Sequence, residues 1–242
     1  MLEIRKFIHQ NIPYSFNWNK DHHNEKFNQI TGNREELSKL KKHFRRVSKG
    51  LIPNDLFNSP NLPRVSQFKI RGLKSTFIRS FSKSLIRSGK IQHYDSESKL
   101  PKYVQKVYES YQDINISGHP GHEPVLKRIL LKDKNSLAIE IPIWNNEKNT
   151  FITGHIDLIQ IENDVVKVID YKPEGKFLVS LPQVATYGFL IKSKLKIQNL
   201  KCLTFNKYEA WEYNPEILLE EVKDYLISQR INERSWENYL TQ

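Results

Sequence analysis

The stretch TFITGHIDLIQIENDVVKVIDYK, residues 150–172, constrains the fold more than any other part of the chain. Two runs rich in β-branched residues flank Asn163-Asp164, a pair typical of tight turns, so the stretch predicts a β-hairpin. Folding the hairpin about this turn brings Asp157 opposite Asp170, and directly opposed residues have Cβ atoms about 5 Å apart. Two like charges at that distance destabilise the hairpin. A divalent cation between them would reverse the sign of that interaction.

The second strand adds a lysine to the acid pair. Because strand side chains alternate, Asp170 and Lys172 share one face and Tyr171 points to the other. One face of the predicted hairpin therefore carries two carboxylates and an ammonium group. Such a set can hold Mg²⁺ through oxygen and can also neutralise or deprotonate an oxygen near a phosphate group.

These residues carry a resemblance to a known family. Asp157 followed by the triplet Asp-Tyr-Lys at 170–172 resembles the D…(D/E)xK signature of the PD-(D/E)XK nuclease superfamily. Gly154 precedes the first acid as in the G-x-x-D of the RecB-like branch, and QVATY at 183–187 resembles the Q-x-x-x-Y helix motif of that branch. The triplet alone is common by chance, but the three motifs in this order are specific. The resemblance covers residues 118–205.

The resemblance implies an α/β fold with a restriction-endonuclease-like core, in which helices flank a mixed central sheet. The periodicity agrees, since from residue 122 it predicts a helix, three strands, a helix, two strands and a helix. We expect a nuclease domain at 63–242 and a mostly helical, basic extension at 1–62. Within the extension, residues 35–48 predict an amphipathic helix with lysines and arginines on its exposed side.

The family pattern also implies the metal ligands. Asp157, Asp170 and the backbone carbonyl of Tyr171 are expected to hold Mg²⁺ or Mn²⁺. His122, at the start of a predicted helix, matches the histidine that joins the metal shell in RecB-like nucleases. Glu123 is the competing candidate, because other branches use a glutamate there.

The remaining site residues follow from the same pattern. Lys172 is expected to orient or deprotonate the attacking water, or to neutralise developing charge, and the sequence leaves these roles open. We predict a helix from Pro182 to Ile191. Gln183 and Tyr187 lie four residues apart on it, so they share one face, which is expected to look toward the active site and the DNA backbone. Glu140 is the one charge in an otherwise apolar predicted strand, and the isoleucines on either side of it are expected to share the opposite face. We expect it to lie behind the metal ligands rather than to bind the ion.

Charge points to an anionic partner. The formal net charge is +11, and residues 64–90 contain eight lysines and arginines and no acid. Residues 75–88 predict an amphipathic helix with Phe77, Phe81 and Leu85 on its apolar side and basic residues along another face. Although charge runs are usually just solvated faces, the absence of any acid favours a contact with DNA, single- or double-stranded ends included. The predicted DNA-contacting residues are Arg71, Lys74, Arg79, Lys83 and Arg87.

Other features limit the class of protein. An anionic membrane is a weaker second partner, the chain has no long apolar run, and its start is too polar for a secretory signal, so we expect a cytoplasmic protein. The single cysteine, Cys202, excludes internal disulfides and a four-cysteine iron–sulfur cluster. A CRISPR adaptation exonuclease family with the Q-x-x-x-Y motif carries such a cluster, so this chain resembles a cluster-free variant.

The sequence therefore predicts a Mg²⁺- or Mn²⁺-dependent deoxyribonuclease, exonuclease-like, in DNA processing, repair or recombination. Two alternatives stay open. One is a non-catalytic DNA-binding or adaptor module on the same fold, and the other is a nuclease directed at RNA. The endonuclease or exonuclease mode and any protein partners also stay open.

Overall fold

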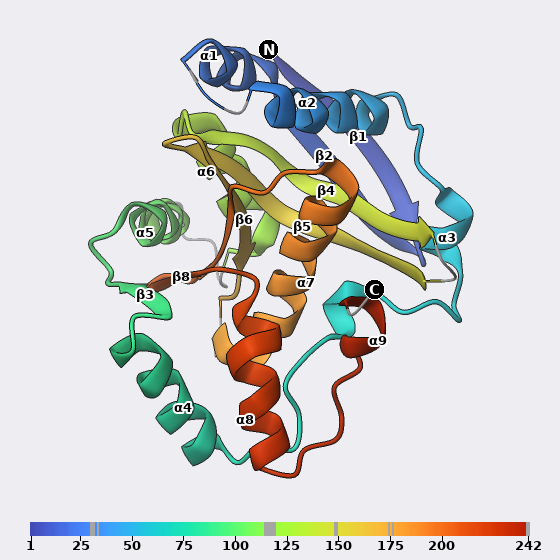
Figure 1. Cartoon of the computed structure of the whole chain (residues 1–242). Coiled ribbons are helices and arrows are strands. Elements are labelled where there is room, and N and C mark those ends of the chain that lie inside the picture. Colours follow the sequence, from blue (N-terminus) through green and yellow to red (C-terminus); the bar gives the residue numbers. More distant parts are fainter. Residues whose placement is uncertain are drawn as a thin grey trace.

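The structure, a computed structural model, describes residues 1–240 apart from 30, 31, 33, 114–119, 148, 149, 174 and 176. This part of the chain folds around one eight-stranded sheet with the strand order β1-β2-β4-β5-β6-β7-β8-β3 (Figure 1). Neighbouring strands are antiparallel except β6 and β7, which are parallel. The strands are β1 (Leu2–His9), β2 (Ile12–Asn19), β3 (Ile91–Tyr94), β4 (Ser136–Glu147), β5 (Thr150–Glu162), β6 (Val165–Tyr171), β7 (Leu200–Phe205) and β8 (Ala210–Tyr213).

Helices flank this sheet, so the expected α/β class with a mixed sheet is confirmed; the predicted core boundary at residue 118 lies outside the described residues. The helices of the described part are α1 (Lys20–Gln29), α2 (Arg34–Ser48), α3 (Asn54–Asn58), α4 (Ser75–Arg87), α5 (Lys99–Asp113), α6 (His122–Lys132), α7 (Phe177–Leu195), α8 (Lys223–Ser228) and α9 (Glu237–Leu240), with a 3-10 turn η1 (Val65–Gln67) and a π-helical turn η2 (Leu218–Val222). Two apolar clusters fill the core: one joins α5 and α6 to the sheet, and the other joins α2, α7 and α8 to it. No helix in these ranges is both long and apolar enough to cross a bilayer.

The central hairpin forms as predicted. Strands β5 and β6 pair in antiparallel register from Glu162↔Val165 to Leu158↔Ile169. Both turn residues, Asn163 and Asp164, have positive φ angles of 48° and 63°. Asn and Asp tolerate this left-handed conformation better than other non-glycine residues, and a turn of this hand matches the twist of the two strands.

The N-terminal region forms strands as well as the expected helices. Helix α2 buries Leu37, Leu40 and Phe44, as its periodicity predicts. Before it, however, β1 and β2 form a hairpin with left-handed residues Gln10 and Asn11 at its turn, and β2 pairs with β4. The prediction of a mostly helical extension missed this hairpin, because alternate positions of β1 that face solvent are also apolar and mask its period of two.

Strand β4 differs from its predicted alternation. The sequence pattern placed Ile139 and Ile141 on one face, yet Ile139 packs in the α5–α6 cluster and Ile141 packs in the α7 cluster. Glu140 between them has a φ angle of +53°, a left-handed conformation that a non-glycine residue rarely adopts within a strand. This one residue changes the side to which the rest of the strand points.

Helix α7 begins five residues earlier than predicted. We expected Pro182 to open it, but the helix starts at Phe177 and Pro182 lies inside it. A proline in a helix interior removes one backbone hydrogen bond. Here the preceding turn buries Phe177, Leu178 and Leu181 in the core, and that burial offsets the loss.

Candidate active site

The two predicted aspartates lie on adjacent strands where β5 and β6 begin to part. The last regular pair of the hairpin is Leu158↔Ile169, so Asp157 and Asp170 are the next residues on each strand. Oδ2 of Asp157 accepts a hydrogen bond from the backbone N–H of Tyr171 at 2.9 Å. The carboxylate thus takes the place of a backbone ladder bond, which fixes it at the junction. Both aspartates are buried, at 9% and 1% exposure respectively.

Lys172 and Gln183 hold Asp170 from two sides. The Lys172 ammonium lies 2.8 Å from Oδ2 of Asp170, and the Gln183 amide donates to Oδ1 at 3.2 Å. Burial and the nearby charge of Asp157 nevertheless raise the pKa of Asp170 to about 7, against the opposing effect of Lys172. Burial alone would lower the pKa of Lys172, but the charges of Asp170 and Asp157 outweigh it and raise that pKa. Lys172 is therefore a cation at neutral pH.

His122 is the first-helix residue that reaches this pair. Its Nδ1 lies 3.4 Å from Oδ2 of Asp157, and its ring meets Tyr171 edge-on at 5.2 Å between centroids. A hydrogen bond with Asp157 raises the pKa of His122 despite its burial. Glu123, the competing candidate, instead forms an ion pair with Lys127 one turn along α6, at 2.6 Å and largely in solvent.

Glu140 lies closer to the acid pair than the sequence indicated. The pairs Ile139↔Leu158 and Ile141↔Ile156 enclose it, so Glu140 stands across from Asp157 on the neighbouring strand. Three carboxylates from β4, β5 and β6 thus follow one another across the sheet. Burial and the charge of Asp157 raise the pKa of Glu140 to about 8. The positive φ angle of Glu140 interrupts the strand and marks this residue as unusual, but it is visible only in the structure.

The motif that begins at Gly154 and the motif at residues 183–187 lie close together in the structure. Gln183 contacts Asp170, and the ring of Tyr187, one turn further along α7, lies against the backbone of Gly154. A Cβ atom at Gly154 would stand 2.5 Å from Cε1 of Tyr187, so only glycine fits there without displacing the ring. Tyr187 is only 1% exposed. The structure therefore places it as a wall behind the site rather than on a surface that DNA could touch.

A cation would have to reorganise these donors. Among the residues that the structure describes, no three His, Cys, Asp or Glu side chains already surround a common point where a metal ion could sit. Asp157 and Asp170 instead direct their oxygens at the Tyr171 N–H, at His122, at Lys172 and at Gln183. The donor set itself suits a hard cation, because it offers carboxylates from three neighbouring strands; burial, and after it the charge of Asp157, raises the pKa values of Glu140 and Asp170, and a bound cation would offset that cost.

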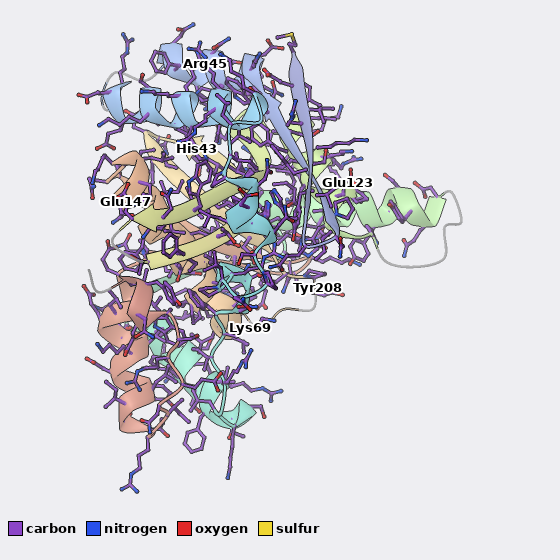
Figure 2. The ribbon with its side chains drawn as sticks, turned by 90° about the vertical axis from the view of Figure 1, so that its right-hand side faces the viewer. His43, Arg45, Lys69, Glu123, Glu147 and Tyr208 are labelled. Carbon is purple, nitrogen blue, oxygen red and sulfur yellow. The ribbon has the colours of Figure 1, made fainter. Side chains whose placement is uncertain are left out.

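A cavity of about 450 Å³ opens beside the lysine and glutamine of the site. Lys172 and Gln183 line it together with Ser66 and Lys69, which lie in and just after the η1 turn. Figure 2 shows Lys69 between the sheet and α4. Lys69 belongs to the acid-free basic segment, yet nothing in the sequence alone places it beside Lys172.

The predicted DNA-contacting residues lie on or just before α4. Arg71 pairs with Glu233 at 3.2 Å, both side chains being more than half exposed. The other four, Lys74, Arg79, Lys83 and Arg87, are exposed, and none has an acidic partner within ion-pair distance among the described residues. Phe77, expected on the apolar side of this helix, is 43% exposed, while Phe81 and Leu85 are buried as predicted.

The comparisons with known proteins add no family to this geometry. No protein-family model matches the sequence, and no curated protein matches it. The site therefore has to be interpreted from its own residues.

Proposed function

We propose that this protein is a Mg²⁺- or Mn²⁺-dependent DNA nuclease with a restriction-endonuclease-like core, similar to the RecB-like branch of the PD-(D/E)XK superfamily. One observation carries the proposal. Two buried aspartates on adjacent strands, Asp157 and Asp170, meet a lysine two residues after the second, a glutamine from α7 and a histidine from the start of α6. A buried acid pair of this kind costs stability unless something positive offsets it, which favours a functional origin.

Each residue has a defined task in the proposed site. Asp157, Asp170 and the Tyr171 carbonyl would hold the ion, with His122 beside Asp157. When bound, a divalent cation lowers the pKa of a water ligand and offsets negative charge on a phosphate group. Gln183 fixes the orientation of Asp170 through its amide.

The surroundings of Lys172 favour two of the roles expected for it. Because nearby carboxylates raise its pKa, it is protonated at neutral pH and is a poor general base in this state. Its position 2.8 Å from Asp170, on the wall of an open cavity, suits a cation that orients a water molecule or neutralises charge on the phosphate group. Ser66 and Lys69, which line the same cavity, would contact the same stretch of the DNA backbone.

A cleavage assay tests the proposal. Purified protein is incubated with end-labelled single-stranded DNA, duplex DNA and RNA, in Mg²⁺, in Mn²⁺ and in EDTA. We expect cleavage of DNA in either metal and none in EDTA. Asp157→Asn and Asp170→Asn should each abolish it, whereas Asp164→Asn, the same change at the hairpin turn, should leave it intact. Parent-like cleavage by Asp157→Asn or Asp170→Asn would refute the assignment.

The two alternatives give different results in the same assay. A non-catalytic DNA-binding or adaptor module would bind labelled DNA but leave it uncut in both metals. An RNA-directed nuclease would cut RNA in preference to DNA. The intact set of acid, acid and lysine favours catalysis, and the exposed cations of α4 fit either nucleic acid.

A further inference from the structure

A second cavity adjoins the one beside Lys172. It has a volume of about 350 Å³, within the range of small-molecule pockets, and forms between α4, the first turn of α7, the edge strand β3 and its neighbour β8. Gly175 lines both this cavity and the one beside Lys172. The two cavities are therefore neighbours around a single backbone position, and Figure 1 shows α4 next to β3 at this end of the sheet.

The interior of this second cavity is apolar and aromatic. Phe177 and Trp211 form its floor, stacked with 4.5 Å between ring centroids and an interplanar angle of 18°. Ile78 and Ile86 of α4 and Leu178 of α7 provide the walls. Flat, apolar surroundings of this kind suit a planar ring.

The rim is polar and mostly positive. Arg79 and Lys83, one turn apart on α4, line the cavity and have no acidic partner within ion-pair distance among the described residues. On the opposite side His93 and Glu209 contact each other at 3.1 Å and also line it. An occupant should therefore combine a planar apolar body, an edge that forms hydrogen bonds and an adjacent negative charge.

We propose that this cavity, defined by α4, Phe177 and Trp211, receives one unpaired nucleobase of a single-stranded DNA end. The base would lie between the α4 isoleucines and the aromatic floor, with its edge toward His93 and Glu209. Arg79 and Lys83 would contact its flanking phosphates, and the strand would pass Gly175 to reach Lys172. This inference rests on the proposed nuclease function, and it specifies the substrate as a strand with an unpaired end, because a base held in a duplex cannot enter the cavity.

Binding measured without divalent metal tests the inference on the intact protein. Fluorescence anisotropy in EDTA compares a labelled single-stranded oligonucleotide with a series in which one nucleotide at a time is abasic. Loss of the one base that enters the cavity should weaken binding about tenfold, and loss at other positions much less. A uniform profile along the strand would overturn the proposal.

Two serines of α4 provide a matched pair of variants. Ser82 lines the cavity, whereas Ser84 on the same helix is exposed and does not. Ser82→Phe should fill the space, weaken single-strand binding about tenfold and flatten the abasic profile. Ser84→Phe should bind like the parent, and thermal unfolding checks that both variants fold. Parent-like binding and an unchanged abasic profile in a folded Ser82→Phe protein would overturn the proposal, and would point to another occupant such as an apolar peptide.

The outcomes separate this inference from the proposed function. A parent protein that shows the single-position abasic effect but cuts no DNA in either metal would refute the nuclease and keep the base pocket. Cleavage that requires Asp170, together with a flat abasic profile, would keep the nuclease and refute the pocket.

Discussion

Replacing Glu140 with glutamine should change how the stability of the metal-free protein depends on pH. Burial and the charge of Asp157 raise the pKa of this carboxyl group from 4.5 to about 8 on folding. The unfolded chain therefore releases this proton at a lower pH than the folded chain does. Its contribution to stability is complete below pH 4.5 and is lost as the pH rises toward 8. The Glu140→Gln variant has no proton to lose there.

The size of the effect follows from linkage. Between the two pKa values each pH unit changes the free energy of unfolding by about 1.4 kcal/mol. From about pH 5.5 to about pH 7.5 the upper bound is thus about 3 kcal/mol, and partial contact of Glu140 with solvent reduces it. We expect the free energy of unfolding of the variant, relative to that of the parent, to rise by on the order of 2 kcal/mol across this interval.

Urea unfolding in EDTA at several pH values measures this difference. Other groups titrate in the opposite sense, notably His23 and His43, whose pKa values burial lowers to about 3 and about 4. Those histidines destabilise the folded state as the pH falls, but they are present in both proteins and cancel in the comparison. Glu35→Gln, at an exposed position of α2, is the control and should track the parent.

Magnesium provides the second arm of the same experiment. A cation near Asp157 competes with protons for the site, so saturating Mg²⁺ should stabilise the parent more at about pH 7.5 than at about pH 5.5.

The expectation for Glu140 is refuted if, in EDTA, the difference in the free energy of unfolding between parent and Glu140→Gln stays constant with pH. It would then follow that the carboxyl group is already ionised and compensated in the folded protein.

Three further predictions concern packing and charge. Gly154→Ala should cost about 1–3 kcal/mol in urea unfolding, because its Cβ would collide with Tyr187, whereas Gly121→Ala, with open space around it, should cost far less. Leu126→Ala empties a fully buried position of α6 and should cost about 2–5 kcal/mol by the same measurement; a cost below about 1 kcal/mol would show that α6 repacks. Arg87→Ala should lower the dependence of DNA affinity on salt by about one unit of log–log slope, and an unchanged slope would exclude a phosphate contact there.

The sequence predicts local elements well where one signal dominates. The central hairpin has β-branched strands around a turn of two residues that tolerate positive φ, and it forms in the predicted register. Helices α2 and α4 follow from their apolar period and from the glycines after them, Gly50 and Gly89, both left-handed.

The rest depends on contacts between distant parts of the chain. Pro182 indicates a helix start by its local preference, but burial of the preceding apolar turn extends α7 toward the N-terminus. The position of Glu140 depends on a backbone reversal inside a strand, which no residue pattern announces. Gln183 was expected to face the active site and the DNA backbone, but its hydrogen bond to Asp170 becomes visible only once α7 is packed on the sheet.

The order of the strands also has a consequence for synthesis of the chain. The two edge strands of the described sheet, β1 and β3, precede in the sequence the strands that join them to the rest of the sheet. The β1–β2 hairpin pairs with β4, and β3 pairs with β8. A nascent chain therefore emerges with its first hairpin and with β3 lacking their neighbours, and the apolar side chains of that hairpin stay uncovered meanwhile. The described sheet can therefore be completed only after β8 has been synthesised.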